Sequence, residues 1–147
     1  MSYPILFLDV DGVLNRCGRS PVRLEPDLLA NLVKIVESTD CQIVLSSTWR
    51  VMPNAMIELT AALSDLGLVI HGMTPDLARK HGASSVWVAV ERGMEIQAWL
   101  DAHGNPPRFA ILDDNSDMAH LEPRLVQTDS FHGLTLGIAS RVVAMLS

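Results

Sequence analysis

The stretch ILFLDVDGVLN, residues 5–15, decides the fold of this chain. Its first half is apolar and ends abruptly at Asp9 and Asp11. This pattern predicts a buried parallel strand that delivers two carboxylates to the carboxyl edge of a sheet. Alternate strand residues point to the same side, and Gly12 then permits a sharp turn. We therefore expect the chemistry of this protein to begin at Asp9 and Asp11.

The Asp-x-Asp-Gly pattern also has a structural explanation, because turns rich in Asp and Gly end ordinary strands or open calcium-binding loops. Two stretches downstream favour a functional site. Ser46 follows the apolar run at residues 42–45, and the run at residues 109–112 ends in the acidic stretch DDNSD, residues 113–117. Polar residues thus follow three predicted strands.

Short apolar runs alternate with stretches of helical periodicity along the whole chain. The runs predict strands at residues 5–8, 42–45, 68–70, 109–112 and 125–127. The periodic stretches predict helices that start near Pro26, Pro53 and Arg92 and after a capping Thr135. In the second of these helices the residues expected to face inward are Met56, Ile57, Leu59, Leu63 and Leu66. Between residues 71 and 90 only Val86–Val90 suggests an element, either a strand or a packing loop.

Alternating strands and helices predict an α/β fold, a three-layer sandwich with a central, mostly parallel sheet covered on both faces. The 147 residues fit a single domain, residues 1–147. A hydrophobic content of 48% and a charged content of 19% are typical of a folded globule. The net charge of −6 excludes broad attraction to nucleic acid, so any polyanion must be held locally. With no leader-like segment, we expect a cytoplasmic protein with no membrane association.

In their order along the chain, these motifs resemble the haloacid dehalogenase (HAD) superfamily. More closely, residues 8–15, 47–50, 92–100 and 111–118 look like the HAD domains attached to the Swiss Army Knife RNA repair proteins. The resemblance covers nearly the whole chain and implies a Rossmann-like HAD core. The intervals 15–42 and 51–91 leave no room for a large cap domain.

The resemblance implies chemistry at phosphorus. Asp9 would be the nucleophile that forms an aspartyl-phosphate, and Asp11 would act as general acid and base. Mg²⁺ would be held by Asp9, the backbone carbonyl of Asp11 and Asp113, and Asp117 would support Asp113 indirectly or through a water molecule. Asp114 is the alternative to Asp113 as the metal ligand.

The remaining site residues would bind the substrate. Ser46 and Ser47 are expected to bind the phosphate, as is Arg92, which fits the family pattern better than its rival Lys80. Trp49 and Arg50 are possible substrate contacts. Four of the site residues have a structural alternative: Ser46 could cap a turn, Arg92 could be a solvated helix end, Asp117 could cap a helix and Trp49 could belong to the core.

The function expected from these residues is that of a hydrolase, a Mg²⁺-dependent phosphatase acting on a phosphate monoester. The phosphorylated substrate is expected to be a nucleic-acid end or a nucleotide. One alternative is a catalytically idle phosphate-binding or interaction module. Another is a HAD-type dehalogenase, against which Asp11 argues, since a halide leaving group needs no proton. The sequence points to no partner protein.

Overall fold

The computed structural model describes residues 2–80, 87–88 and 90–147. Its centre is a five-stranded, all-parallel sheet in the order β3-β2-β1-β6-β7. The strands are β1 (Ile5–Leu8), β2 (Gln42–Leu45), β3 (Ile70–Met73), β6 (Phe109–Asp113) and β7 (Leu125–Gln127). The predicted α/β class is confirmed. Because all five strands are parallel, their carboxyl ends lie along one edge of the sheet.

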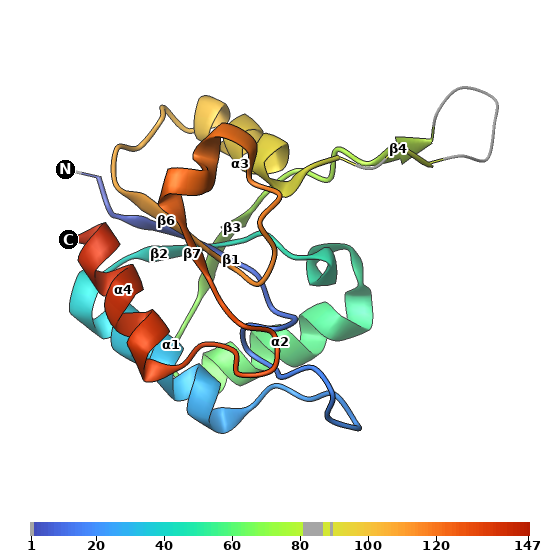
Figure 1. Ribbon diagram of the computed structural model, residues 1–147, viewed down its shortest axis with the longest axis vertical. Coiled ribbons are helices and arrows are strands. Elements are labelled where there is room, and N and C mark those ends of the chain that lie inside the picture. Colours follow the sequence, from blue (N-terminus) through green and yellow to red (C-terminus); the bar gives the residue numbers. More distant parts are fainter. Residues whose placement is uncertain (1, 81–86, 89) are drawn as a thin grey trace.

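Helices cover both faces of the sheet (Figure 1), as predicted. Alternate residues of β1 serve the two layers: Leu6 and Leu8 pack with α1, α2 and α4, whereas Ile5 and Phe7 pack with α3. The helices are α1 (Pro26–Thr39), α2 (Pro53–Asp65), α3 (Arg92–Ala102) and α4 (Leu136–Leu146), with the 3₁₀ helices η1 (Thr48–Val51) and η2 (Ala119–Arg124). The central strand is buried on both sides, which explains why its sequence is continuously apolar.

The helix starts follow local chemistry. Pro26 and Pro53 occupy the first turns of α1 and α2, where a missing backbone N–H costs nothing. The Thr135 side chain accepts a hydrogen bond from the backbone N–H of Ile138 and so caps α4. In the described residues no helix combines the length and apolar character needed to cross a membrane.

The third strand begins later than the sequence predicts. The strand expected at residues 68–70 is wrong in its bounds, because pairing with β2 starts at Ile70 and continues to Met73. The backbone N–H groups of Gly67 and Leu68 are instead bonded to carbonyls of the last turn of α2. The end of the helix therefore uses the donors that an earlier strand start would need.

Two inward-facing residues of α2 were also predicted wrongly. Ile57 is 69% exposed and Leu66 is 42% exposed, whereas Leu59 and Leu63 are fully buried. The helix lies against the β2–β3 edge of the sheet, so it buries only a narrow stripe of its surface.

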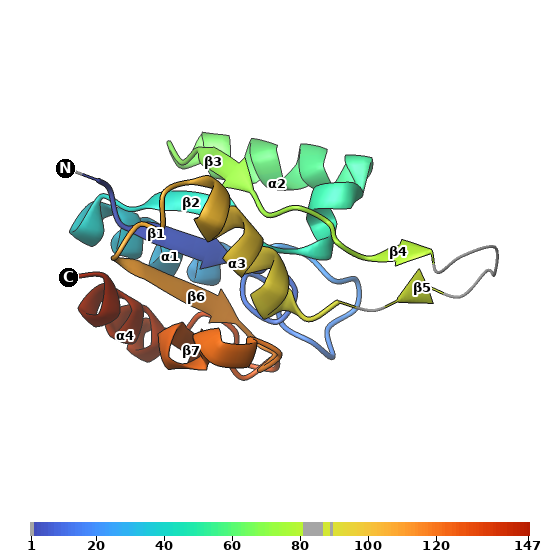
Figure 2. The same cartoon turned by 90° about the horizontal axis from the view of Figure 1, so that it is seen from above.

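An antiparallel pair, β4 (Arg79–Lys80) and β5 (Trp87–Val88), forms an arm between β3 and α3. Figure 2 shows that the arm extends beyond the carboxyl edge of the sheet and away from its core. Of the run predicted at Val86–Val90, Trp87 and Val88 form a strand, while residues 86 and 89 lie outside the described residues. The described arm is far too small to be an independent cap, as expected.

Candidate active site

The end of β1 places two carboxylates at the middle of the carboxyl edge. The backbone N–H of Asp9 donates to the carbonyl of Leu112 on β6 at 3.0 Å, which ties the two strand ends together. Gly12 follows with a φ of +76°, and a side-chain carbon there would lie 2.3 Å from the Asp114 carboxylate. Glycine is thus required both for the turn and for the close approach of Asp114.

Three carboxylates from these two strand ends converge. Asp9, Asp113 and Asp114 each present an oxygen within 4.8 Å of the others. Asp9 and Asp113 are buried. Burial raises the pKa of Asp9. Burial also raises the pKa of Asp113, and the negative charge of Asp9 raises it further. The positive charge of Arg92 partly offsets both increases. Buried like charges need a cation between them, and hard carboxylate oxygens suit Mg²⁺.

Asp117, expected to support the metal site indirectly, is engaged at the start of α3. Its carboxylate accepts a hydrogen bond from the backbone N–H of Arg92 at 3.1 Å, and its carbonyl accepts one from Gly93. Asp117 therefore caps the start of α3, as the structural alternative proposed. The partner that the structure brings to Asp9 and Asp113 is Asp114.

Ser46 follows β2, next to the end of β1 that carries Asp9. Its backbone N–H is bonded to the carbonyl of Leu8 at 2.8 Å, so it lies beside the residue that precedes Asp9. The side chain is 1% exposed, and its Oγ has no hydrogen-bond partner among the described residues. A buried hydroxyl without a partner is costly, which indicates that a bound ligand satisfies it. Ser47, in contrast, caps η1 by accepting from the Trp49 backbone N–H.

Replacing Ser46 with alanine should leave the melting temperature of the ligand-free protein unchanged or raise it, because the lost hydroxyl is unsatisfied. Affinity for phosphate should fall by roughly tenfold or more, since a charge-assisted hydrogen bond is lost. Ser47→Ala is the matched control and should instead lower stability by about 1 kcal/mol through the lost cap. Thermal unfolding and inorganic phosphate titrations measure both effects. A Ser46→Ala protein that is destabilised but binds phosphate normally would contradict the assignment.

Arg92 is the cation beside the carboxylates. It begins α3, is largely covered, and its Nη1 lies 3.6 Å from Glu95 Oε1. Its charge acts on both Asp9 and Asp113. The rival residue, Lys80, belongs to β4 on the arm that extends away from the core (Figure 2). The arrangement therefore favours Arg92 as the phosphate-binding cation.

Arg50 is not free to contact a substrate, contrary to the sequence interpretation. It forms an ion pair with Glu95 at 2.9 Å, in which both side chains are buried. It also donates to the carbonyls of Ser47 and Thr74. These bonds join the loop after β2 to the segment after β3 and to α3, so Arg50 supports the site without facing it.

Two residues hold Asp11, and sequence reasoning assigned a role to neither contact. Asn15 Nδ2 and Trp49 Nε1 both donate to Asp11 Oδ1, at 2.9 and 3.1 Å. Asn15 Oδ1 accepts from the backbone N–H of Gly12, which fixes the amide orientation. Trp49 is buried, so its side chain contacts Asp11 within the protein instead of the predicted substrate contact. In the sequence, the only indication of this contact is that Asn15, a residue with a side-chain amide, lies four positions after Asp11.

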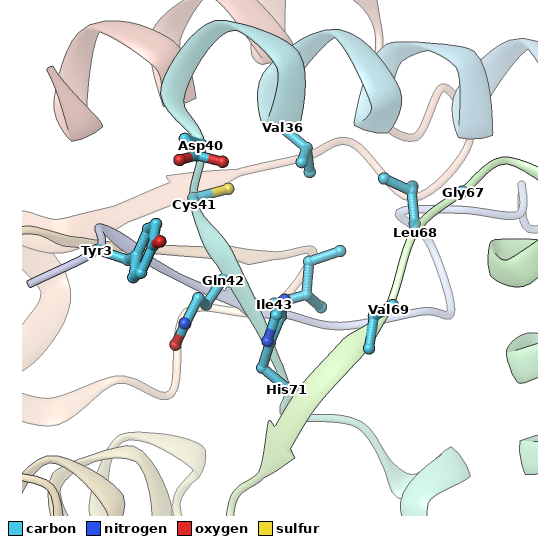
Figure 3. Close-up of a pocket in the computed structure, with 10 residues that line it drawn as sticks. All are labelled: Tyr3, Val36, Asp40, Cys41, Gln42, Ile43, Gly67, Leu68, Val69 and His71. Carbon is cyan, nitrogen blue, oxygen red and sulfur yellow. The ribbon is translucent and has the colours of Figure 1, made fainter.

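A separate hollow of about 260 Å³ lies near the amino end of β2 (Figure 3). It is lined by Tyr3, Val36, Asp40, Cys41, Gln42, Ile43, Gly67, Leu68, Val69 and His71. Gln42 is the first residue of β2, whereas the carboxylates follow the last residues of β1 and β6. This hollow is therefore not part of the carboxylate site.

An open parallel sheet with acids after the neighbouring strands β1 and β6, and a serine after β2, has the arrangement expected for the haloacid dehalogenase superfamily. Within it, this chain belongs to the family described as the HAD domain in Swiss Army Knife RNA repair proteins, which matches residues 5–137. No curated protein matches the sequence. Membership supports phosphoester hydrolysis as the general activity.

Proposed function

We propose that this protein is a Mg²⁺-dependent phosphatase that hydrolyses a phosphate monoester through an aspartyl-phosphate. The observation that carries the proposal is the buried Ser46 hydroxyl, which has no hydrogen-bond partner among the described residues and follows β2, the strand next to the β1 end that carries Asp9. A hydroxyl donor, a cation and a carboxylate nucleophile at one edge suit a tetrahedral anion.

Asp9 attacks phosphorus, and the bond between phosphorus and the leaving oxygen breaks. Asp11 gives its proton to that oxygen, so the alcohol leaves neutral. Asp11, now ionised, takes a proton from water, whose oxygen attacks the phosphorus of the aspartyl-phosphate. Inorganic phosphate leaves, and Asp9 and Asp11 return to their starting states.

The carboxylate cluster fits a divalent cation by its charge, its burial and its hard oxygen donors. Asp9, Asp113 and Asp114 would hold Mg²⁺, together with the backbone carbonyl of Asp11 that the family pattern implies. When bound, the ion offsets the repulsion between the Asp9 carboxylate and the phosphate and stabilises the developing charge.

The test is phosphate release from a panel of phosphate esters, with and without Mg²⁺ and with a chelator. We expect turnover that needs Mg²⁺ and stops on chelation. Phosphate binding without turnover of any ester would establish the idle binding module instead. Halide release from a 2-haloacid, without ester hydrolysis, would establish a dehalogenase.

The substrate that we propose is a nucleotide or a nucleic-acid end. The family is named for its RNA repair context, and the described residues form no large cap over the site, which leaves room for a bulky alcohol. The acidic composition offers no extended track for a long polyanion, so recognition should be confined to groups near the phosphate.

Trp49→Phe should slow hydrolysis of an alkyl phosphate by about tenfold, because Asp11 loses one of its two orienting hydrogen bonds. The loss should be smaller for p-nitrophenyl phosphate, whose leaving oxygen needs little protonation. Trp99→Phe is the matched control, since Trp99 is buried on the opposite face of the sheet. Both variants should lose some stability. If Trp49→Phe slowed the hydrolysis of both substrates by the same factor, the orienting role of Trp49 would be contradicted.

A further inference from the structure

A hollow of about 550 Å³ opens beside Asp11, and the steps proposed for phosphate hydrolysis do not involve it. Its volume lies within the range of small-molecule sites. It lies between the loop that links β1 to α1 and the start of α2, two segments that run close together in Figure 1. Its lining residues are Asp11, Asn15, Arg16, Cys17, Val22, Trp49, Met52, Asn54, Ala55 and Glu58.

The position of the hollow next to Asp11 indicates which part of a substrate it could bind. Asp11 lines the hollow and, in the proposed reaction, gives its proton to the leaving oxygen. The hollow therefore offers room beside Asp11 for the carbon skeleton attached to that oxygen.

Part of the wall of the hollow is apolar. Val22 and Met52 are 57% and 50% exposed although both are apolar, and they come from the two segments that form the hollow. Exposed apolar side chains beside a reactive group favour contact with an apolar part of a ligand. A hollow of about 550 Å³ has room for a leaving group larger than glycerol.

The charge of the hollow is negative. Asp11 and the exposed Glu58 both line it. Among the described residues that line it, Arg16 is the only cation, and it already pairs with Glu25 and Asp27 at 2.7 Å each. The second phosphate of a doubly phosphorylated substrate would be repelled by the Glu58 carboxylate, and Arg16 is already paired with other acids.

We propose that this hollow binds an uncharged leaving alcohol the size of a nucleoside, and that Glu58 discriminates against leaving groups that carry another phosphate. The proposal rests on the proposed phosphatase function. It narrows the substrate to a single nucleotide unit, because an oligonucleotide would bring its next phosphate to Glu58.

The experiment compares kcat/KM for the two adenosine monophosphates (3′ and 5′), adenosine 3′,5′-bisphosphate, glycerol phosphate and a 3′- or 5′-phosphorylated oligonucleotide, at fixed salt and Mg²⁺. We expect the better monophosphate to exceed each of the other substrates. Glu58→Lys should raise the efficiency ratio of bisphosphate to monophosphate by roughly tenfold, because two unit charges change near the second phosphate. Glu37→Lys is the matched control, since it makes the same charge change at an exposed position of α1 and should not alter the ratio. Met52→Ala should reduce the advantage of the monophosphate over glycerol phosphate.

Failure of this proposal differs from failure of the phosphatase function. If the parent protein hydrolyses p-nitrophenyl phosphate with Mg²⁺ but prefers the bisphosphate, the oligonucleotide or glycerol phosphate, the leaving-group site is overturned and the phosphatase stands. An unchanged ratio in Glu58→Lys overturns the role of Glu58. If no phosphate ester is hydrolysed, the phosphatase function and the site that depends on it both fall.

Discussion

Replacing Asp9 with asparagine should abolish turnover, with a loss of about 10⁴-fold or more, because the amide retains the shape of the side chain but cannot attack phosphorus. Phosphate release from p-nitrophenyl phosphate under saturating Mg²⁺ measures the loss. The fold should survive, since Asp9 is buried and the substitution removes a charge that burial disfavours. Thermal unfolding of the same preparation checks this.

Asp65→Asn is the matched control for the nucleophile. It makes the same chemical change at an exposed position at the end of α2 and should leave turnover within about twofold of the parent. Near-parental activity in a sequence-verified Asp9→Asn protein would reject Asp9 as the nucleophile. Loss of activity together with loss of the folded state would instead call for Asp9→Glu, which keeps the charge but shifts the attacking oxygen.

Asp113→Asn should raise the Mg²⁺ concentration needed for half-maximal activity by about 10²-fold or more, because a buried carboxylate of the three-acid cluster is lost. Asp117→Asn is the comparison that the structure supplies. Its oxygen can still accept the hydrogen bond from Arg92, so Mg²⁺ activation should change little. Mg²⁺ titrations of initial rate, with each variant's melting temperature, separate the two residues.

Asp114→Asn should have an intermediate effect, since Asp114 joins the cluster but is less buried than Asp113. A larger effect at Asp117 than at Asp113 would reject Asp113 as the principal metal ligand. Equal effects at Asp113 and Asp114 would mean that both are direct ligands.

The central part of the fold could be predicted because its cause is local. Residues 5–8 and 109–112 are continuously apolar, which requires strands buried on both faces and therefore a parallel sheet between helix layers. Parallel strands end at one edge, so Asp9, Ser46 and Asp113 had to lie near one another. The edge strand β3 was placed two residues too early, because only the hydrogen bonds of Gly67 and Leu68 reveal where α2 ends.

The sequence by itself determined the fold class, the edge that carries the site and the acids that end its two central strands. Only the tertiary structure decided which polar side chains are free. Asp117 caps α3, Arg50 pairs with Glu95, and the Ser46 hydroxyl has no partner in the part of the chain that the structure describes. Spacing along the chain restricts where a residue lies, but a hydrogen bond depends on donors and acceptors brought from distant segments. Because a polar side chain already satisfied within the protein gains little by binding a ligand, those distant partners decide which residues remain available for function.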